Sequence, residues 1–518
     1  MNRITATTLR GWIEDGGELA LLDAREEGEF GASHLFWAVP CPLSRAETRA
    51  HSLLPNLATR IVCVDDGRGL AERLAAYLES IGATNVAVLD GGTRDWEAAG
   101  HVLFSGVNVP SKAFGEWIEH HFGTESVDAP ELKAWIDSGR DMVVLDSRTW
   151  EEYQRMSIPT GISVPGGELA YRIADLVPNP DTLVIVNCAG RTRSILGAES
   201  LRQAGIPNKV VALRNGTMGW ELAGLVCDRG RSAKFPAGTP KTAAQAMQRA
   251  DAFATRSGVQ IIDAAGLATL AADPSRSIYV LDVRDPAEFA AGHLAGSASA
   301  PGGQLVQATD TWIGVRGARI ALIDDDGVRA RMSAAWLRQM GHPDVYVVTN
   351  GLAAAALPRA AAPEPAPSPT VDADTLAACT DALVIDLTRS IDFRDGHIPG
   401  ALWGIRTRLA LLKDRLATAK MVVLTSSDGK AAQWAAAEAQ ALTQAKVTTL
   451  AGGTAAWSKA AHPLTKDRTS PPDNACVDFY LRPYDRNSGV EDAMKAYLSW
   501  EIDLVHEITR DGTVRFGT

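Results

Sequence analysis

One pattern occurs four times along the chain, and a repeated pattern constrains a fold more than any single motif does. Each copy opens with two apolar residues and an aspartate, followed by an acidic helical segment that contains an aromatic residue. The four opening phrases are LLDAR at 21–25, VLDSR at 144–148, VLDVR at 280–284 and VIDLT at 384–388. The sequence therefore predicts four similar domains in tandem.

Each copy continues with a second short apolar run that ends in a polar or glycine-bearing loop. These segments are IVCVDDGRG, LVIVNCAGR, IALIDDDGV and MVVLTSSDG. An alanine- and leucine-rich helical stretch and a third apolar run follow. Short apolar strands that alternate with helical patterns indicate βαβ units. The predicted fold class is α/β, with four similar domains in tandem. Each domain is expected to contain a mostly parallel sheet with helices on both faces.

The four domains are expected at 1–104, 125–229, 258–357 and 371–465, with an aromatic-rich C-terminal extension at 466–518. Their linkers differ in composition. TAAQAMQRADAFA, within 230–257, predicts a helix, whereas the Pro/Ala-rich segment 358–370 predicts an extended spacer.

The extension carries too many aromatic residues for a disordered tail, so we expect it to pack on the domains. Its sequence predicts a helix over 491–508 and a hairpin-like end over 509–517.

Composition excludes several classes of function. The formal net charge of −11 argues against a nucleic-acid or anionic-membrane surface. No apolar run approaches the ~20 residues that span a bilayer, and the N-terminus does not read as a signal peptide. Six cysteines without a CxxC pair predict neither a disulfide framework nor a zinc site. We expect a cytoplasmic protein without metal or other cofactor; its oligomeric state is left open.

Several of these features together resemble the rhodanese (sulfurtransferase) homology domain. They are the LDxR opening, a histidine-containing turn such as GHIPGALW at 396–403, the strand–loop–helix segment and a closing Gly-Gly and Trp. The resemblance covers the four repeats and implies sulfur transfer through a loop cysteine. The second copy has Ser157 where the others have His34, His293 and His397, so we interpret these histidines as structural.

The four loops differ in the residue that would carry the sulfur. Aligned on the loop glycine, Cys188 of the second copy corresponds to Asp65, Asp325 and Ser427 in the others. Neither a carboxylate nor a hydroxyl can form a persulfide. The sequence thus predicts that only the second domain is catalytic and that the other three are inactive.

The candidate site is the loop CAGRTRS at 188–194. Cys188 ends a strand, the chain turns back, and a helix is expected to open at Ser194. A tight loop at a helix start directs backbone N–H groups toward its centre, where a thiolate or persulfide would be stabilised. The expected binding residues of this loop are Ala189, Gly190, Arg191, Thr192, Arg193 and Ser194.

Charged residues near the loop allow two interpretations. Arg191 or Arg193 could receive an anionic donor through bidentate hydrogen bonds. Alternatively, Arg193 pairs with an acid of its own domain and only shapes the loop. Asp146 and Arg148 are expected to support the loop as an ion-paired network. Cys227, which follows the second repeat, is a candidate resolving thiol.

Three function classes fit these observations. The favoured one is a sulfurtransferase that moves sulfane sulfur from a small anionic donor, thiosulfate by default, to cyanide or a thiol. The second is a phosphatase or arsenate reductase, but four residues separate Cys188 from Arg193, whereas the loops of those enzymes have five. The third is a non-catalytic scaffold or sulfur-carrier partner, suggested by the three inactive repeats. For the favoured function, we expect residues 1–229 to suffice for activity.

Replacing Cys188 tests the assignment of the catalytic residue. Cys188→Ser is expected to abolish sulfur transfer, because a hydroxyl of similar size is a far weaker nucleophile, and to leave the circular dichroism spectrum unchanged. Residual transfer above a few per cent of the wild-type rate would show that another cysteine carries the sulfur.

Overall fold

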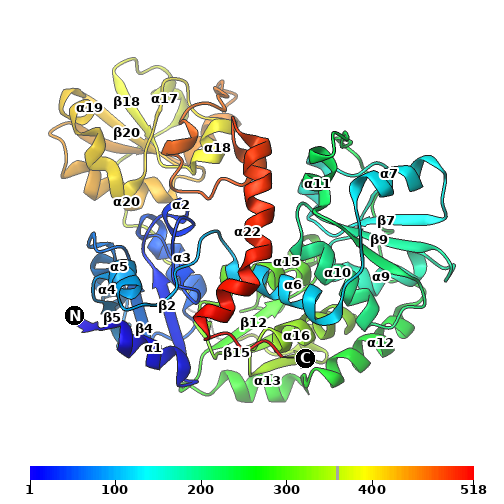
Figure 1. Cartoon of the computed structure of the whole chain (residues 1–518). Coiled ribbons are helices and arrows are strands. Elements are labelled where there is room, and N and C mark those ends of the chain that lie inside the picture. Colours follow the sequence, from blue (N-terminus) through cyan, green and yellow to red (C-terminus); the bar gives the residue numbers. More distant parts are fainter. Residues whose placement is uncertain (358–360, 518) are drawn as a thin grey trace.

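Four parallel sheets, one for each repeat, organise the computed structural model, which describes residues 1–357 and 361–517 (Figure 1). Counting the strands within each repeat, the order across every sheet is first, fifth, fourth, second, third. Non-consecutive neighbours of this kind require helical crossovers, which place helices on both faces of the sheet. The predicted fold class is confirmed.

The strands are short and lie in register within each sheet. In sheet order they are β1 (Asn2–Ile4), β5 (Val86–Leu89), β4 (Ile61–Val64), β2 (Leu19–Asp23) and β3 (Val39–Pro40) in the first domain. The second has β6 (Ser126–Val127), β10 (Val210–Leu213), β9 (Leu183–Asn187), β7 (Met142–Asp146) and β8 (Ile162–Ser163). The third has β11 (Gln260–Ile262), β16 (Val345–Val348), β15 (Arg319–Ile323), β12 (Ile278–Asp282) and β13 (Ala298–Ser299). The fourth has β17 (Thr370–Val371), β21 (Lys446–Leu450), β20 (Met421–Thr425), β18 (Ala382–Asp386) and β19 (Leu402–Trp403).

Helices follow the strands in the same order in every domain, except that a 3-10 turn (Gly351–Ala353) replaces the last helix of the third domain. The first domain has α1 (Ala6–Glu14), α2 (Glu27–Phe30), α3 (Ala46–Leu53), α4 (Leu70–Ser80) and α5 (Gly92–Ala98). The second has α7 (Ala129–Asp137), α8 (Trp150–Arg155), α9 (Leu169–Leu176), α10 (Thr192–Gln203) and α11 (Gly216–Leu222). The third has α13 (Ala264–Ala271), α14 (Pro286–Ala291), α15 (Gly302–Gln307) and α16 (Val328–Gln339). The fourth has α17 (Ala373–Ala377), α18 (Ser390–Asp395), α19 (Lys413–Thr418), α20 (Lys430–Gln440) and α21 (Gly453–Lys459).

Each central strand is buried on both faces, which explains why it reads as a continuous apolar run. In β9, Leu183 and Ile185 belong to one hydrophobic cluster, and Val184 and Val186 belong to the cluster on the opposite face. The alternation follows from the two-residue period of a strand. None of the helices in the described ranges has both the length and the apolar character needed to cross a membrane.

The first three domains share one core, whereas the hydrophobic clusters of the fourth contain only its own residues. A short strand of the third repeat, β14 (Val315–Arg316), pairs antiparallel with β2 and so extends the sheet of the first domain. In Figure 1 the fourth domain, in yellow and orange, lies beside the first. The first and third repeats are thus joined through both a sheet edge and a common core.

The linkers between domains form part of this packing. The helix predicted within 230–257 is present as α12 (Ala243–Arg256), which packs on α9 and α16. A further helix, α6 (Val109–Phe122), follows the first domain and packs on α10. The first three residues of the spacer predicted at 358–370 lie outside the described residues, and its described part up to 369 has neither helix nor strand.

The C-terminal extension packs on the body, as its aromatic content predicted. Its long helix, α22 (Val490–Asp511), packs on α6 and runs between the first and second domains (Figure 1). Backbone atoms of the extension form hydrogen bonds with every domain: Arg394 to Pro471, Gly28 to Val477, Arg155 to Tyr484 and Gly517 to Gln339.

The end of the extension differs from the prediction. The hairpin expected over 509–517 is absent, because α22 continues to Asp511 and residues 512–517 contain no strand. Gly512 ends the helix in the left-handed region, with φ +70°. Beyond it Phe516 packs against the rings of Phe114 and Trp117, so contacts with α6 replace a hairpin pairing.

A matched pair of substitutions in α22 tests this docking. Leu504 is fully buried and Ile502 is 44% exposed. Leu504→Ala is expected to destabilise docking by about 2–5 kcal/mol, since it removes buried methyl groups and leaves a cavity. Amide hydrogen exchange in α22 should then accelerate by roughly thirtyfold or more, whereas Ile502→Ala should leave it near the wild-type rate. Equal exchange in the two variants would contradict the packing described here.

Candidate active site

Cys188 follows directly after β9, at the carboxyl edge of the second sheet. Its side chain is only 2% exposed, and its thiol contacts the Ser194 hydroxyl at 3.5 Å. The Ser194 hydroxyl in turn donates to the carbonyl of Arg191 at 2.8 Å. The helix after the loop, α10, begins at Thr192 and not at Ser194 as expected, so Thr192 and Arg193 belong to its first turn.

The backbone amides of this loop are not used in hydrogen bonds within the part of the chain that the structure describes. Among the described residues, no oxygen or nitrogen accepts a hydrogen bond from the N–H groups of residues 189–193. Buried N–H groups are normally paired. A loop of consecutive unpaired amides at a helix start is suited to hold a negatively charged sulfur.

In the other three domains, aspartates of the equivalent loops accept hydrogen bonds from loop amides. Asp65 accepts from the N–H groups of Gly67, Leu70 and Ala71. In the third and fourth domains Asp326 accepts from Val328 and Arg329, and Asp428 accepts from Lys430. Some of the amides that are unpaired in the Cys188 loop are therefore satisfied by carboxylates in these loops.

The strand register corrects the alignment of the loops. Asp146, Asp282 and Asp386 pair with Asn187, Ile323 and Thr425, so the residues after those three positions are equivalent. Cys188 therefore corresponds to Asp324 and Ser426, one residue before the predicted Asp325 and Ser427. The alignment on glycines failed because the glycine is the second residue after Cys188 but the third after Asp324 and Ser426, although the helix begins at the fourth residue in all three loops. The chemical conclusion is the same, since neither residue carries a thiol.

Arg193 pairs with Glu152 of its own domain. The two side chains form two hydrogen bonds, of 2.6 and 2.7 Å. Glu152 is presented by α8, where it also takes part in a capping box with Thr149. Burial by itself would raise the pKa of Glu152, but the charge of Arg193 and its hydrogen bonds hold that pKa well below its usual range. Of the two interpretations of Arg193, the contacts support the one in which it shapes the loop.

Arg191 pairs with two carboxylates of the linker helix α6. It donates to Glu116 at 2.8 and 2.7 Å and also contacts Glu119. Glu116 is fully buried, and burial raises its pKa although Arg191 opposes the rise. The helix approaches the loop closely at Gly115, where an added Cβ would lie 2.8 Å from the Thr192 methyl group. No spacing in the sequence indicated this pair, because its members are 75 residues apart.

Asp146 and Arg148 form the expected supporting network. The Arg148 guanidinium donates to Asp146 at 2.9 and 2.7 Å and also to the Met156 carbonyl. The Asn187 side chain donates to the same carboxylate at 3.0 Å, which ties the network to the end of β9. The first and third domains have the same pairs, Asp23 with Arg25 and Asp282 with Arg284. Their presence in domains without a loop cysteine indicates a structural role.

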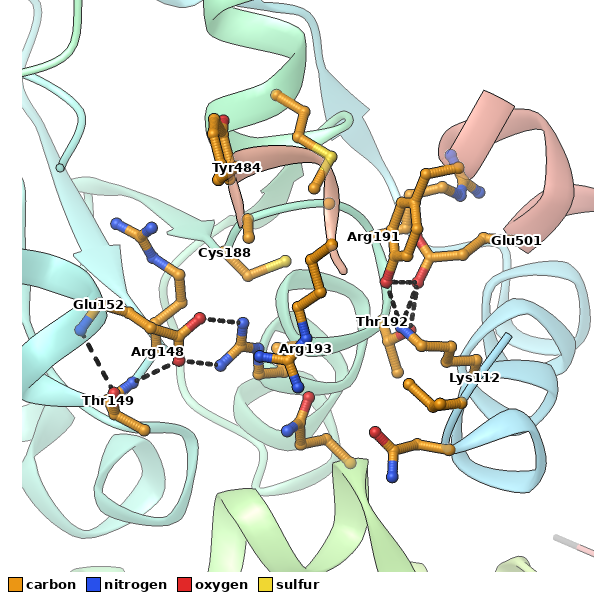
Figure 2. A pocket seen from close by; sticks show the side chains of 18 of the residues that line it. Lys112, Arg148, Thr149, Glu152, Cys188, Arg191, Thr192, Arg193, Tyr484 and Glu501 are labelled. Carbon is orange, nitrogen blue, oxygen red and sulfur yellow. Dashed lines mark hydrogen bonds and ion pairs between the residues drawn. The ribbon is translucent and has the colours of Figure 1, made fainter. Parts of the chain in front are cut away.

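A cavity of about 360 Å³ opens in front of Cys188. Figure 2 shows the Cys188 side chain directed into it, with Tyr484 of the extension nearby. Its walls come from four parts of the chain: the second domain, helix α6, the third domain and the C-terminal extension. The residues from outside the second domain include Lys112, Gln304, Gln307, Tyr480, Arg482, Tyr484, Asp485, Tyr497 and Glu501. A fragment ending at 229 lacks most of these residues, so it does not contain the whole cavity.

Helix α22 contacts the catalytic loop directly through Glu501. This carboxylate is 1% exposed and accepts from Lys112 at 2.9 Å and from the Thr192 hydroxyl at 3.2 Å. The Tyr497 hydroxyl contacts both Lys112 and Glu501. Sequence motifs did not identify Glu501 or Tyr497, because both lie in a segment without a recognisable motif, and Glu501 is 309 residues from its partner Thr192.

The remaining cysteines and the turn histidines lie away from this chemistry. Cys227 does not line the cavity, and burial raises the pKa of its thiol to about 12, which argues against a resolving role. In each of the three turn histidines, Nδ1 contacts the backbone carbonyl of a phenylalanine, and the imidazole stacks on the ring of the same phenylalanine. They stabilise the turn, as interpreted from the sequence.

Comparison with known proteins identifies the family. The rhodanese-like domain model matches residues 5–99, 128–223, 263–356 and 371–460. The crystal structure of a thiosulfate sulfurtransferase from Pseudomonas aeruginosa is 46% identical, covers 100% of both chains and superposes with a TM-score of 0.94. An HTH-type transcriptional regulator of Mycobacterium tuberculosis, Rv0324, is 34% identical over 107 residues, which are 20% of this chain and 46% of that protein. The chain belongs to the rhodanese family, as a member with four tandem domains.

Substitutions in the buried ion pair of Arg191 and Glu116 test whether this pair stabilises the loop. Arg191→Gln leaves a buried carboxylate without its partner, which is expected to cost about 3–5 kcal/mol of stability and to lower turnover. Adding Glu116→Gln should recover part of the melting temperature, since the unpaired charge is then removed. KM for the sulfur donor should change less than about threefold, because the arginine is already bound to protein carboxylates.

Arg214 is an exposed arginine of the same domain and serves as the control. Arg214→Gln should leave melting temperature and turnover near those of the wild type. A tenfold or larger rise in KM for Arg191→Gln, without loss of stability, would instead assign Arg191 to donor binding.

Proposed function

We propose that this rhodanese-type sulfurtransferase carries sulfane sulfur as a persulfide on Cys188, with thiosulfate as donor and cyanide or a thiol as acceptor. The observation that carries the proposal is the set of unpaired amides around Cys188, in the one loop of the four that has a thiol. The other three loops have no cysteine at this position, and loop aspartates accept from some of their amides, so sulfur transfer is assigned to the second domain alone.

In the first half-reaction the Cys188 thiolate attacks the outer sulfur of thiosulfate. A new S–S bond forms to Cys188, the sulfur–sulfur bond of the donor breaks, and sulfite leaves with the bonding electron pair. The terminal sulfur of the persulfide retains a negative charge. The N–H groups of residues 189–193 and the dipole of α10 stabilise that charge.

In the second half-reaction the acceptor attacks the terminal sulfur. Cyanide leaves as thiocyanate, or a thiolate leaves as a new persulfide, and the electrons of the broken bond return to Cys188 as its thiolate. The cycle is ping-pong, because the first product departs before the acceptor reacts. The ion pairs Arg193–Glu152 and Asp146–Arg148 hold the loop in position through both steps.

The choice of donor rests on the full-length relative, which is a thiosulfate sulfurtransferase. A four-residue interval between Cys188 and Arg193 and the engagement of Arg193 by Glu152 disfavour the phosphatase alternative, since no loop arginine is left to bind a phosphate. The proposal also places the protein in the cytoplasm, where its six free cysteines would stay reduced.

Intact-protein mass spectrometry tests the proposed intermediate. Incubation with thiosulfate is expected to add one sulfur atom to the peptide that contains Cys188, and subsequent cyanide should remove it with release of thiocyanate. Cys188→Ser should gain no sulfur under the same conditions. A parallel incubation with 3-mercaptopyruvate distinguishes the donors: loading by that compound and not by thiosulfate would overturn the donor assignment, and loading by neither would overturn the persulfide.

A further inference from the structure

The C-terminal extension forms one side of the catalytic cavity. Six of its side chains line that cavity: Tyr480, Arg482, Tyr484, Asp485, Tyr497 and Glu501. The extension is held in place near Arg482, because Arg155 of the second domain binds the Tyr484 carbonyl at 2.7 Å and Asp485 at 3.2 Å. The backbone that carries Arg482 is therefore positioned by contacts with the catalytic domain.

The basic side chains that line the cavity differ in whether a carboxylate already binds them. Five are ion-paired: Lys112 with Glu501, Arg148 with Asp146, Arg155 with Asp485, Arg191 with Glu116 and Arg193 with Glu152. Arg482 is the sixth. It is exposed, and within the described part of the chain its guanidinium has neither a hydrogen bond nor an ion pair.

The reaction needs a cation on the side of the cavity away from the loop. The loop amides bind the sulfur that is transferred, and the leaving group departs on the side of that sulfur opposite Cys188. Thiosulfate carries its remaining charge on this leaving end, and sulfite keeps that charge after the bond breaks. A guanidinium without a carboxylate partner binds such oxyanions through paired N–H groups.

The field of Arg482 already reaches the cavity. Glu152, which lines the same cavity, is among the carboxylates whose pKa its positive charge lowers, together with Arg193 and Arg148 and against the effect of burial. The positive charge of Arg482 therefore acts beside the Cys188 loop, although no group among the described residues is hydrogen-bonded to its guanidinium.

We propose that Arg482, supplied by the C-terminal extension, binds the oxyanion end of the sulfur donor and receives the leaving sulfite. This inference rests on the proposed function and assigns donor specificity to a residue outside the four rhodanese-like domains. Arg191 and Arg193, in contrast, hold the loop through carboxylates and are not available to the donor.

Arg482→Gln in the full-length chain tests this role, with Arg486→Gln as the matched control. Arg486 is exposed in the same segment but does not line the cavity. Arg482→Gln is expected to raise KM for thiosulfate about ten- to hundredfold, with turnover at saturating donor changed less than about threefold. Arg486→Gln should match the wild type.

Two further readouts separate donor binding from a structural effect. KM of the wild type should rise with ionic strength, because salt screens an exposed charge, and this dependence should be weaker in Arg482→Gln. Arg482→Lys retains the charge and should recover most of the affinity for thiosulfate. If Arg482→Gln also lowers the melting temperature, this variant shows whether the rise in KM comes from the lost charge or from lost stability. Removal of the loaded sulfur by dithiothreitol, a neutral acceptor, should proceed at the wild-type rate in all variants.

The outcomes distinguish this inference from the proposed function. If the wild type is loaded with sulfur by thiosulfate but Arg482→Gln and Arg486→Gln have the same KM, the role of Arg482 is wrong and the persulfide mechanism stands. If thiosulfate does not load Cys188 in the wild type, the proposed donor itself fails, and the role of Arg482 fails with it.

Discussion

In each repeat, the N–H groups of the loop after the fourth strand need hydrogen-bond acceptors. The four domains differ in how this requirement is met. A loop that joins a buried strand to a helix leaves several N–H groups without a backbone acceptor. In three domains an aspartate of the loop itself, Asp65, Asp326 or Asp428, accepts from one or more of them. In the loop that follows Cys188 in the second domain, the N–H groups of residues 189–193 have no acceptor among the described residues. The loop of the second domain thus differs from the other three both in its thiol and in its unpaired amides.

The surroundings of the catalytic loop are built by segments far from it in sequence. The linker helix α6 supplies the carboxylates that bind Arg191, and α22 supplies Glu501, which accepts from Lys112 and Thr192. Buried ion pairs add less to stability than their number suggests, but breaking one is costly because it leaves a buried charge. These pairs therefore specify how the linker, the loop and the extension fit together. The cavity in front of Cys188 is therefore formed jointly by several domains and the C-terminal extension.

Sequence periodicity and repetition were sufficient to predict the four domains and their parallel sheets, whereas the assignment of Cys188 as the catalytic cysteine stays a prediction. The helix of the second linker and the packing of the extension were also predicted correctly. The equivalences of Cys188 in the third and fourth loops were one residue off, because the loop glycine does not lie at the same distance from the strand end in every repeat. The hairpin predicted after residue 508 was wrong, because Gly512 stops α22 later and Phe516 finds a partner in α6.

The sequence by itself determined where a persulfide could form, since only one repeat places a thiol between a strand and a helix, and that local pattern depends on residues close together in the chain. It did not determine which charges remain available to a substrate. Arg191 and Arg193 looked like donor ligands until the tertiary structure placed Glu116 and Glu152 against them, and Arg482 had no motif to mark it. Whether a guanidinium is paired depends on carboxylates brought to it by folding, and only the tertiary structure specifies those neighbours.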